Sequence, residues 1–377
     1  MNIRIFEEFA STLAKICAAS SLAQDRPLLW TCIANPRAGG FTIGSRWKKH
    51  RAALEACAER AGKTKRRGPA RPSDTSRKFD GASGVLGSYG LFLTARPGAA
   101  GEIVRALLDE AAAASAVVPP PFFLIITAGG DGTSLEAQLA LYEAHPALRS
   151  NFAILRLPMG TGNDGADAWE LDKALELLTE KTSIEYSRAL RLRTSTRGKG
   201  PFLAFNILSL GLDAFVTHMT NKMKGSLPGD SYKLWVDIAA LLYDKVYKVG
   251  AMELNAYDEG GAQVLSLNEP LLLSAMGVSG KRTYGSHKMI LPDERNVCVL
   301  RQMSLFRKFS LKGLFATGGH VDKKEAALCN ASRLEFRYRY PILAQMDGEA
   351  VRLEAEDFPV SIELTEPAIP VLKKLEP

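Results

Sequence analysis

Four short, almost purely apolar runs constrain the fold of this chain more than any other feature of its sequence. The runs are LLWTCIA (28 to 34), YGLFLT (89 to 94), FFLIITA (122 to 128) and FAILRLP (152 to 158). Turn residues and then a helical pattern follow each run, which predicts helices over residues 45–61, 99–114, 134–144 and 168–179. Strands that are apolar along their whole length and alternate with helices are typical of a parallel sheet covered on both faces.

The later part of the chain has a different pattern, with alternating and β-branched segments that predict an antiparallel β-sandwich. These segments span residues 202–216, 251–257, 270–278, 296–303, 333–340 and 358–365, with one helix over 231–246. A chain of 377 residues is about right for two domains. The fold class is therefore α/β plus all-β. An N-terminal doubly wound, mainly parallel sheet domain is followed by a C-terminal antiparallel domain.

The predicted boundaries follow these changes in pattern. They are a leading helical segment at 1–27 (helix over 3–18), an α/β domain at 28–187, a β-rich domain at 188–360, and a tail at 361–377 that could return to the first domain. A basic stretch rich in glycine, proline and serine interrupts the first domain over residues 62–84 and predicts a flexible surface insertion. A solvated loop and a contact with anionic lipid headgroups are the two interpretations of this insertion.

The composition excludes several classes of protein. No apolar run approaches the roughly 20 residues that span a bilayer, and Glu7 and Glu8 interrupt what would be a secretory signal, so we expect a cytoplasmic protein. The five scattered cysteines form no CxxC pair, which predicts reduced thiols and argues against a disulfide framework or a zinc site. The net charge of +7 suits an anionic membrane surface, nucleic acid or a phosphorylated ligand.

Polar and glycine-rich residues follow every strand of the predicted parallel sheet. They read NPRAGG (35 to 40), TARPG (94 to 98), GGDGT (129 to 133) and PMGTGND (158 to 164). The carboxyl ends of parallel strands meet at one edge, so these turns predict a rim of backbone N–H groups, hydroxyls and carboxylates. Such a rim is how proteins hold the phosphate chain of a nucleotide.

The GGDGT turn places Asp131 between Gly130 and Gly132. We expect the glycines to adopt positive φ and to let the backbone approach a ligand, with Thr133 capping the next helix and offering its hydroxyl to a phosphate. Asp131 would meet the phosphates through a divalent cation, because a bare carboxylate repels them. The structural alternative is a tight turn in which Asp131 is only the N-cap of a helix.

The PMGTGND turn repeats this composition at the next strand end. Gly160 and Gly162 would open the backbone, Thr161 would donate a hydroxyl, and Asn163 and Asp164 would act as polar anchors. No GxxxxGK[ST] and no GxGxxG after a strand occurs in the chain, so the sequence has neither the motif of a P-loop nucleoside triphosphatase nor a dinucleotide-binding fingerprint.

These motifs, together with GLDA (211 to 214) and MDGEA (346 to 350), resemble the diacylglycerol kinase catalytic-domain family, which includes bacterial lipid kinases, sphingosine kinases and ceramide kinases. NAD kinases are more distantly similar, because they share GGDGT but not the P-x-G-T-x-N-D element. The resemblance implies a two-domain ATP-dependent kinase, with ATP on the rim of the first domain and the lipid hydroxyl reaching the cleft between the domains.

The resemblance also implies which residues would bind ATP and Mg²⁺. The predicted nucleotide-binding residues are Asn35, Pro36, Arg37, Ala38, Gly39, Thr94, Gly129, Gly130, Asp131, Gly132, Thr133, Glu136, Gly160, Thr161, Gly162, Asn163 and Asp164. Asp131 and Asp164 are the predicted metal ligands, and Asp131 also counts as catalytic because it would orient the phosphates.

Asp347 is the predicted general base, which would take the proton from the acceptor hydroxyl, and Glu349 would help to hold the metal or a water. Taken alone, Asp347-Gly348 between two alternating segments is also the standard signal of a hairpin turn. The upstream motifs favour an acid at the tip of a hairpin that faces the substrate.

This chain departs from the family pattern in four places, one of which is Leu135 of GTSLE (132 to 136), where the family commonly has a polar residue. Residues 163 to 167 read NDGAD instead of NDFAR, and residues 94 to 100 read TARPGAA instead of TxxxGHA. In LPDERNVCVL (291 to 300), Asp293 remains but Cys298 and Val299 stand where a metal-binding loop would have Asp and Gly. A structural Mg²⁺ in the second domain is therefore not expected.

The leading hypothesis is an ATP-dependent kinase that phosphorylates a lipid hydroxyl, for example diacylglycerol to phosphatidic acid. We expect a lipid substrate presented at a membrane surface, and peripheral contact of the protein with the inner face of that membrane. We expect no nucleic-acid partner, and a homodimer is left open. Two alternatives remain: a soluble-acceptor kinase similar to NAD kinase, and a nucleotide-binding regulatory protein with impaired catalysis.

Overall fold

The computed structural model describes residues 3–20, 22, 25–63, 70–72, 85–86, 90–160, 162–223, 243–284 and 288–375. The chain divides into two compact units, of which unit 1 comprises Met1–Ser187 and Pro367–Pro377 and unit 2 comprises Arg188–Glu366. Most of the basic insertion at 62–84 and most of the helix expected at 231–246 lie outside the described residues.

Unit 1 is built on an eight-stranded sheet in the order β3-β4-β1-β5-β6-β21-β7, with β2 paired to β1. Its strands are β1 (Leu28–Ala34), β2 (Ala70–Pro72), β3 (Val85–Leu86), β4 (Leu91–Leu93), β5 (Phe122–Gly129), β6 (Phe152–Pro158), β7 (Thr182–Ser187) and β21 (Ile369–Lys374). The four strands β4, β1, β5 and β6 run parallel, as the apolar runs predict. Every residue of β5 and β6 is buried.

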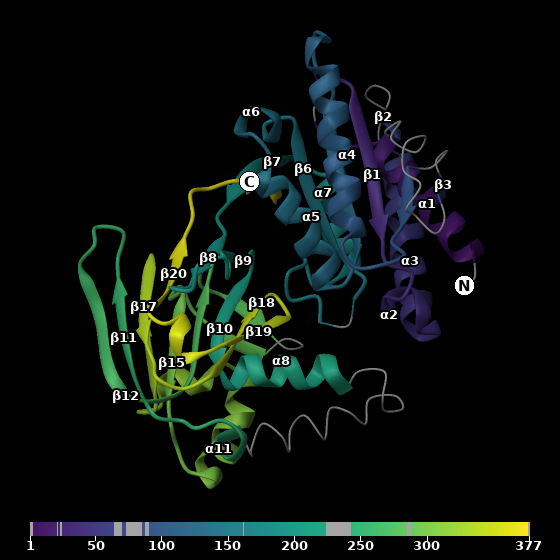
Figure 1. The fold of residues 1–377 in the computed structure, drawn as a ribbon. Helices are drawn as coiled ribbons and strands as arrows, with labels where there is room; N and C mark the ends of the chain where they lie inside the picture. The colour runs from purple at the N-terminus through teal and green to yellow at the C-terminus, as the bar shows by residue number, and fades with distance from the viewer. Residues whose placement is uncertain are drawn as a thin grey trace. The chain divides into compact units, whose positions relative to one another are not determined.

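Helices cover both faces of this sheet (Figure 1). They are α1 (Ile3–Ala18), α2 (Gly39–Thr42), α3 (Gly44–Gly62), α4 (Ala99–Ala113), α5 (Asp131–Glu143), α6 (Pro146–Arg149) and α7 (Leu171–Thr179), with the short 3-10 helix η3 (Ala114–Ala116). Buried side chains of α1, α3 and α7 share one core cluster with alternate residues of β1, β5 and β6. Helices α4 and α5 pack on each other and contact β5. Since Thr127 of β5 bonds to Ser134 of α5, these two helices belong to the opposite face.

The C-terminal tail completes the sheet of unit 1. Strand β21 pairs parallel with β6 through Val371 and Ile154, and antiparallel with β7 from Ile369 to Lys374. Arg149 adds a hydrogen bond of 3.4 Å from Nη1 to the carbonyl of Ala368. Strand β21 therefore belongs to the same sheet as the strands that carry the glycine-rich turns, and Leu372 belongs to their core.

Unit 2 is an antiparallel eleven-stranded sheet in the order β19-β18-β10-β12-β11-β17-β20-β8-β9, with β15 paired to β12 and β16. Its strands are β8 (Leu190–Arg193), β9 (Phe202–Ala204), β10 (Ile207–Gly211), β11 (Ala251–Tyr257), β12 (Gln263–Gly277), β15 (Val297–Arg301), β16 (Ala326–Cys329), β17 (Arg333–Arg337), β18 (Ile342–Met346), β19 (Glu349–Leu353) and β20 (Val360–Leu364). A separate pair joins β13 (Arg282–Tyr284) to β14 (Lys288–Leu291). The long β12 pairs with β11 in its first half and with β10 in its second, so one strand joins both parts of the sheet.

The expected β segment over 202–216 is wrong in its last part, because the helix α8 (Leu212–Met223) begins there. Gly211 permits this change of direction: its φ is +95°, and a Cβ on it would lie 2.5 Å from the carbonyl oxygen of Leu272. The other helices of unit 2 are α10 (Tyr243–Val246), α11 (Leu305–Lys312), η4 (Gly313–Ala316), η5 (Gly319–Asp322) and η6 (Ala355–Asp357).

The described part of the chain contains no helix that is both long and apolar enough to cross a bilayer. All five cysteines are free thiols, as their scatter in the sequence predicts, and four of them are buried. Burial raises the pKa of the Cys298 thiol to about 12. These thiols therefore belong to the core and not to a reactive site.

Candidate nucleotide-binding rim and carboxylate turn

The four glycine-rich turns meet at one edge of the unit 1 sheet, as the strand pattern predicts. Ala34 is paired with both Leu93 and Ala128, and Gly129 with Pro158, so the four strands end level with one another. The backbone N–H groups of neighbouring turns bond across this edge. Asn35 donates to the carbonyl of Ala128 at 3.0 Å, and Thr94 to that of Ala34 at 2.9 Å.

Helix α5 begins at Asp131, three residues earlier than the helical pattern predicts. Gly130 is the N-cap, and no side chain caps this helix end. The expected capping role of Thr133 is therefore wrong, and so is the alternative in which Asp131 is the N-cap. Asp131 stands in the first turn of the helix, where the helix dipole favours a negative charge.

The glycines of the two motifs permit close approach and not positive φ. Gly130 has a φ of −92° and Gly132 lies within α5, so the expectation of positive φ is wrong for both; Gly129, Gly160 and Gly162 have no positive φ either. A Cβ on Gly129 would lie 2.5 Å from Thr133 Oγ1, and one on Gly160 would lie 2.5 Å from the Cα of Gly130. The GGDGT and PMGTGND turns therefore touch backbone to backbone, which only glycine allows.

Asn163 holds the PMGTGND loop closed and is the residue that takes positive φ there, at +59°. Its Oδ1 accepts from the N–H of Gly160 at 2.6 Å, and its Nδ2 donates to the carbonyls of Pro158 and Gly160, both at 3.2 Å. Asparagine tolerates the left-handed region better than other residues that carry a side chain. Asn163 therefore holds the loop itself, and its predicted contact with ATP stays a prediction. Thr161 lies outside the described residues.

Two carboxylates lie close to Gly162 in this loop. Asp131 Oδ2 lies 2.9 Å and Asp164 Oδ2 3.2 Å from the point that a Cβ on Gly162 would occupy. Asp131 Oδ1 also accepts from the N–H of Gly165 at 3.0 Å. Asp131 and Asp164 come from different strand ends, so the fold brings together the two residues predicted as metal ligands.

Glu136 has a structural role that the sequence does not reveal. Its Oε1 accepts from the N–H of Gly98 at 2.7 Å, and its Oε2 accepts from that of Ala100 at 3.1 Å. Gly98 is the N-cap of α4 and has a φ of +85°. Glu136 of α5 therefore caps α4 and joins the turn after β4 to the turn after β5. Its predicted contact with ATP stays a prediction.

A buried ion pair anchors the far end of the PMGTGND loop, and sequence reasoning missed it. Arg156 on β6 and Asp167 have side chains only 10% and 6% exposed, and Nη2 of the arginine lies 2.6 Å from Oδ1 of the aspartate. The backbone N–H of Arg156 donates to Asp167 Oδ2 at 2.7 Å, and its Nη1 donates to Gln138 Oε1 at 3.1 Å. Asp167 stands where the family pattern NDFAR has arginine, and in this chain it pairs with Arg156. The presence of one arginine within the apolar strand β6 was the sequence signal for a buried ion pair.

In unit 2, Asp347 and Gly348 form the two-residue turn of the β18–β19 hairpin, as their sequence predicts. Both have positive φ, +48° and +99°. The Asp347 carboxylate accepts three backbone N–H groups: Oδ1 accepts from Asn206 at 3.0 Å and Ile207 at 2.9 Å, and Oδ2 accepts from Phe205. It therefore fixes the turn to the start of β10.

A polar network around the Gln345 side chain also holds this turn. Gln345 Oε1 accepts from the N–H of Gly348 at 3.1 Å, and its Nε2 donates to Ser209 Oγ at 3.0 Å and Asp213 Oδ2 at 3.3 Å. Asp213 belongs to the GLDA motif, which gives that motif a role in holding the hairpin. Glu349 is exposed on β19, two residues after Asp347.

The loop that departs from the family metal-binding pattern is held by an arginine. Asp293 Oδ1 accepts from Arg295 Nε at 3.0 Å and from its backbone N–H at 2.9 Å. The Arg295 guanidinium lowers the pKa of the Asp293 carboxyl through this hydrogen bond. Cys298 and Val299 are fully buried in β15, where they cannot contribute oxygen ligands.

The donor set fits Mg²⁺ only in part. Within the described ranges no three His, Cys, Asp or Glu side chains lie close enough together to hold a metal ion. The pair formed by Asp131 and Asp164 does fit the usual form of a nucleotide-bound Mg²⁺, which takes one or two protein carboxylates and completes its shell with phosphate oxygens and waters.

Part of the chain that carries this rim is similar to a known family. Residues 30–192 match the family model described as "Diacylglycerol kinase catalytic domain", which confirms the resemblance over this segment and supports a kinase, that is, a phosphotransferase. The matched segment contains all four glycine-rich turns. A search of curated proteins finds no match to the chain.

Two solved structures share the fold over most of the chain. Both are of "a putative diacylglycerol kinase from Bacillus anthracis str. Sterne" and are 16% identical to this chain; one covers 92% of this chain and 97% of its own with a TM-score of 0.54, and the other covers 93% and 96% with a TM-score of 0.55. Yeast NADH kinase is 10% identical and covers 92% of this chain and 83% of its own, with a TM-score of 0.43.

Proposed function

We propose that this chain is an ATP-dependent lipid kinase, which transfers the γ-phosphate of ATP to a lipid hydroxyl such as that of diacylglycerol. The observation that carries the proposal is the rim itself. Residues 30–192 match the diacylglycerol kinase catalytic domain, and within them the carboxylates of Asp131 and Asp164 both lie close to Gly162. Backbone groups on a glycine-rich edge with two carboxylates suit a nucleotide phosphate chain and its metal.

In this proposal the rim binds and orients the nucleotide. The first turn of α5 offers backbone N–H groups to the phosphates, while Asp131 and Asp164 would hold Mg²⁺, which neutralises charge on the phosphates when bound. Close packing of Gly130 against Gly160 leaves no side chain in the way of the phosphate oxygens. Phosphoryl transfer depends mainly on such positioning and charge stabilisation.

Asp347 would take the proton of the acceptor hydroxyl. The hydroxyl oxygen forms a bond to the γ-phosphorus, the bond between that phosphorus and the bridging oxygen of ADP breaks, and the proton passes to the Asp347 carboxylate. The three backbone donors hold this carboxylate in a fixed orientation. Glu349 would position a water or the metal nearby.

The test is Mg²⁺-dependent transfer of radiolabel from ATP, with lipids in micelles and product identification by mass spectrometry. Diacylglycerol, sphingoid base, ceramide, phosphatidylglycerol and NAD are offered as acceptors. We expect a labelled phosphate monoester of one lipid, and a loss of at least about 100-fold in Asp131→Ala and in Asp347→Asn. Asp109→Ala on the exposed face of α4 and Asp258→Asn in another hairpin turn are the matched controls and should keep activity.

Label on NAD and on no lipid would replace the lipid kinase with a soluble-acceptor kinase. ATP binding by calorimetry without turnover on any acceptor would favour a nucleotide-binding regulatory protein. One observation favours the regulatory protein. The Asp347 carboxylate already accepts three backbone hydrogen bonds, and these occupy acceptor positions that a general base also needs.

A further inference from the structure

Helix α11 of unit 2 is turned with its aromatic side outward. Phe306 is 88% exposed, Phe309 56% and Leu305 44%, and these side chains lie on the same side of the helix. The lysine between them points inward: Lys308 is only 6% exposed, and its Nζ lies 3.1 Å from Asp244 Oδ1. Single exposed apolar residues are common, but a helix that buries its lysine and exposes two phenylalanines presents an apolar face to something outside the chain.

The surroundings of this face have an excess of basic residues. Residues 301–325 contain six basic residues (Arg301, Arg307, Lys308, Lys312, Lys323, Lys324) and two acidic residues, Asp322 and Glu325. Three of the basic side chains are paired with acids: Arg301 with Glu269, Arg307 with Glu325 and Lys308 with Asp244. Helix α11 has no acidic residue at all. This short stretch therefore carries most of the excess charge of the chain, whose net charge is +7.

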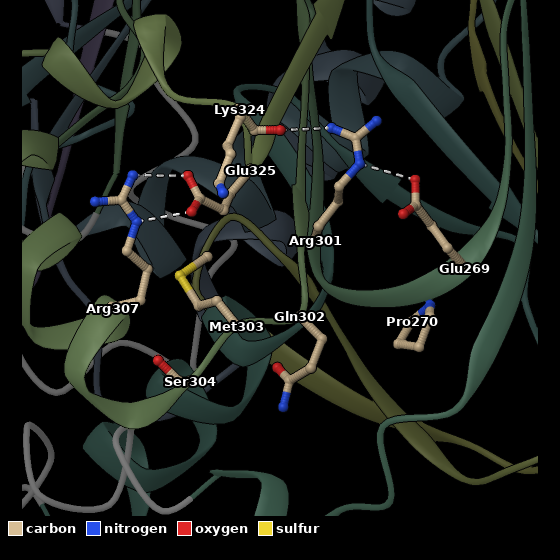
Figure 2. Close-up of a pocket in the computed structure, with 9 residues that line it drawn as sticks. All are labelled: Glu269, Pro270, Arg301, Gln302, Met303, Ser304, Arg307, Lys324 and Glu325. Atoms are coloured by element: carbon tan, nitrogen blue, oxygen red, sulfur yellow. Dashed lines mark hydrogen bonds and ion pairs between the residues drawn. The ribbon is translucent and has the colours of Figure 1, made fainter.

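A pocket of about 840 Å³ opens beside the start of α11 (Figure 2). Three cationic side chains line it: Arg301, Arg307 and Lys324. Glu325 holds Arg307 through Nε at 2.7 Å and Nη2 at 2.9 Å, and Glu269 holds Arg301 through Nε at 2.8 Å. Within the described residues, Nη1 of Arg307 and Nη2 of Arg301 have no hydrogen-bond acceptor, so each arginine keeps one group for an anionic ligand.

We propose that α11 is a membrane-docking helix: Leu305, Phe306 and Phe309 enter the interface of an anionic bilayer, and the pocket beside them takes a phosphate of a lipid headgroup on Arg301, Arg307 and Lys324. The inference rests on the proposed function only in that a lipid kinase has to reach its substrate at a bilayer. The surface itself is defined by exposure and charge.

The bilayer is chosen as the occupant because of charge complementarity. An interfacial helix places aromatic and leucine side chains at the boundary between headgroups and acyl chains, with basic residues around it, and each basic side chain near an anionic surface contributes about 1 kcal/mol. A protein partner would need a matching acidic face, whereas an anionic bilayer supplies negative charge on every side of the helix.

The test is co-sedimentation of the full chain with vesicles of phosphatidylcholine alone and with vesicles that also contain about 30% phosphatidylglycerol, whose anionic headgroups attract basic side chains. We expect binding to the anionic vesicles, weaker binding as ionic strength rises, and a partition coefficient at least about tenfold lower in the double variant Phe306→Ser/Phe309→Ser. Lys323→Glu/Lys324→Glu should lower it as well, and only on anionic vesicles. The matched control is Val117→Ser/Val118→Ser, which removes two side chains of unit 1 that are 53% and 91% exposed, and it should bind as the parent does.

Unchanged vesicle binding in the phenylalanine variant overturns the inference. So does a dimer, measured by light scattering, that becomes a monomer in this variant while vesicle binding persists, because the face would then join two copies of the chain. Activity on a short-chain, water-soluble lipid separates this result from the proposed function. If the phenylalanine variant keeps that activity but loses activity on bilayer lipid, both stand. If the parent binds vesicles but phosphorylates no acceptor, only the proposed function fails.

Discussion

The PMGTGND loop of unit 1 and the Asp347-Gly348 turn of unit 2 both combine glycine with an acid, yet glycine serves opposite purposes in them. Gly160 has an ordinary backbone conformation, but a Cβ on it would strike Gly130 at 2.5 Å. Gly348 has a φ of +99° and nothing within 4 Å of its Cβ position. The first glycine is required by its neighbours and the second by its own backbone.

The two regions are also anchored differently. A buried ion pair between Arg156 and Asp167 fixes the end of the first loop, whereas backbone N–H groups fix the Asp347 carboxylate in the second. Leaving a buried charge without its partner costs more free energy than replacing a half-buried carboxylate by an amide of the same shape, which keeps part of its hydrogen bonding. We therefore expect substitutions in the loop of unit 1 to lower the free energy of unfolding more than substitutions in the turn of unit 2.

Arg156→Leu should have the largest effect, a loss of about 3 to 5 kcal/mol in the free energy of unfolding, because it leaves the Asp167 carboxylate buried without its charge partner. Denaturation by urea measures the change. The matched control is Arg193→Leu, whose 54% exposed side chain pairs with Glu363 and should contribute less than about 1 kcal/mol. Equal losses in the two variants would show that burial of the pair does not matter.

Gly160→Ala should cost about 2 to 3 kcal/mol, because the new methyl group forces the GGDGT and PMGTGND turns apart. ATP affinity, measured by calorimetry, should fall with it. Gly44→Ala is the control: nothing lies within 4 Å of its Cβ position in α3, and alanine there should be neutral or slightly stabilising. A stable Gly160→Ala variant with unchanged ATP affinity would contradict the assignment of the rim.

Asp347→Asn should lower the free energy of unfolding by about 1 to 2 kcal/mol, since an amide nitrogen faces one or more backbone N–H groups that the carboxylate accepted. Asp258→Asn, whose carboxylate accepts from Ala262 at 2.8 Å in a solvent-exposed turn, should cost less. Thermal unfolding followed by circular dichroism compares them. A loss of kinase activity without any loss of stability in Asp347→Asn would assign the residue to catalysis alone.

Gly348→Ala should have the smallest effect, about 1 kcal/mol, because only the left-handed backbone opposes the new side chain. Gly348→Asn should cost less than alanine, since asparagine tolerates this region. Chemical denaturation of both variants is the measurement. If alanine and asparagine cost the same, something other than φ restrains the position.

Sequence patterns predicted the elements of unit 1 well, because burial on both faces of a strand and the helical repeat are properties of short segments. The helix expected over 99–114 spans Ala99–Ala113, and the strand expected over 152–158 is Phe152–Pro158. The error at 202–216 has a tertiary cause: Gly211 packs against Leu272 of another strand, and the chain turns into α8 there.

The site divides in the same way. The sequence placed Asp131 and Asp164 at adjacent strand ends, and the parallel register brought both to Gly162. It did not show that Glu136 caps a helix that begins 37 residues earlier in the chain, nor that Asp347 bonds to the backbone of residues 205–207.

The sequence by itself determined the alternation of strands and helices, the rim of glycine-rich turns and the hairpin at Asp347, because each depends on neighbours a few residues away. Only the tertiary structure decided which polar groups are partners, as with Arg156 and Asp167, and which helix presents its aromatic side outward, as α11 does. Partnership and exposure depend on what packs against a residue from distant parts of the chain, and local periodicity carries no record of that.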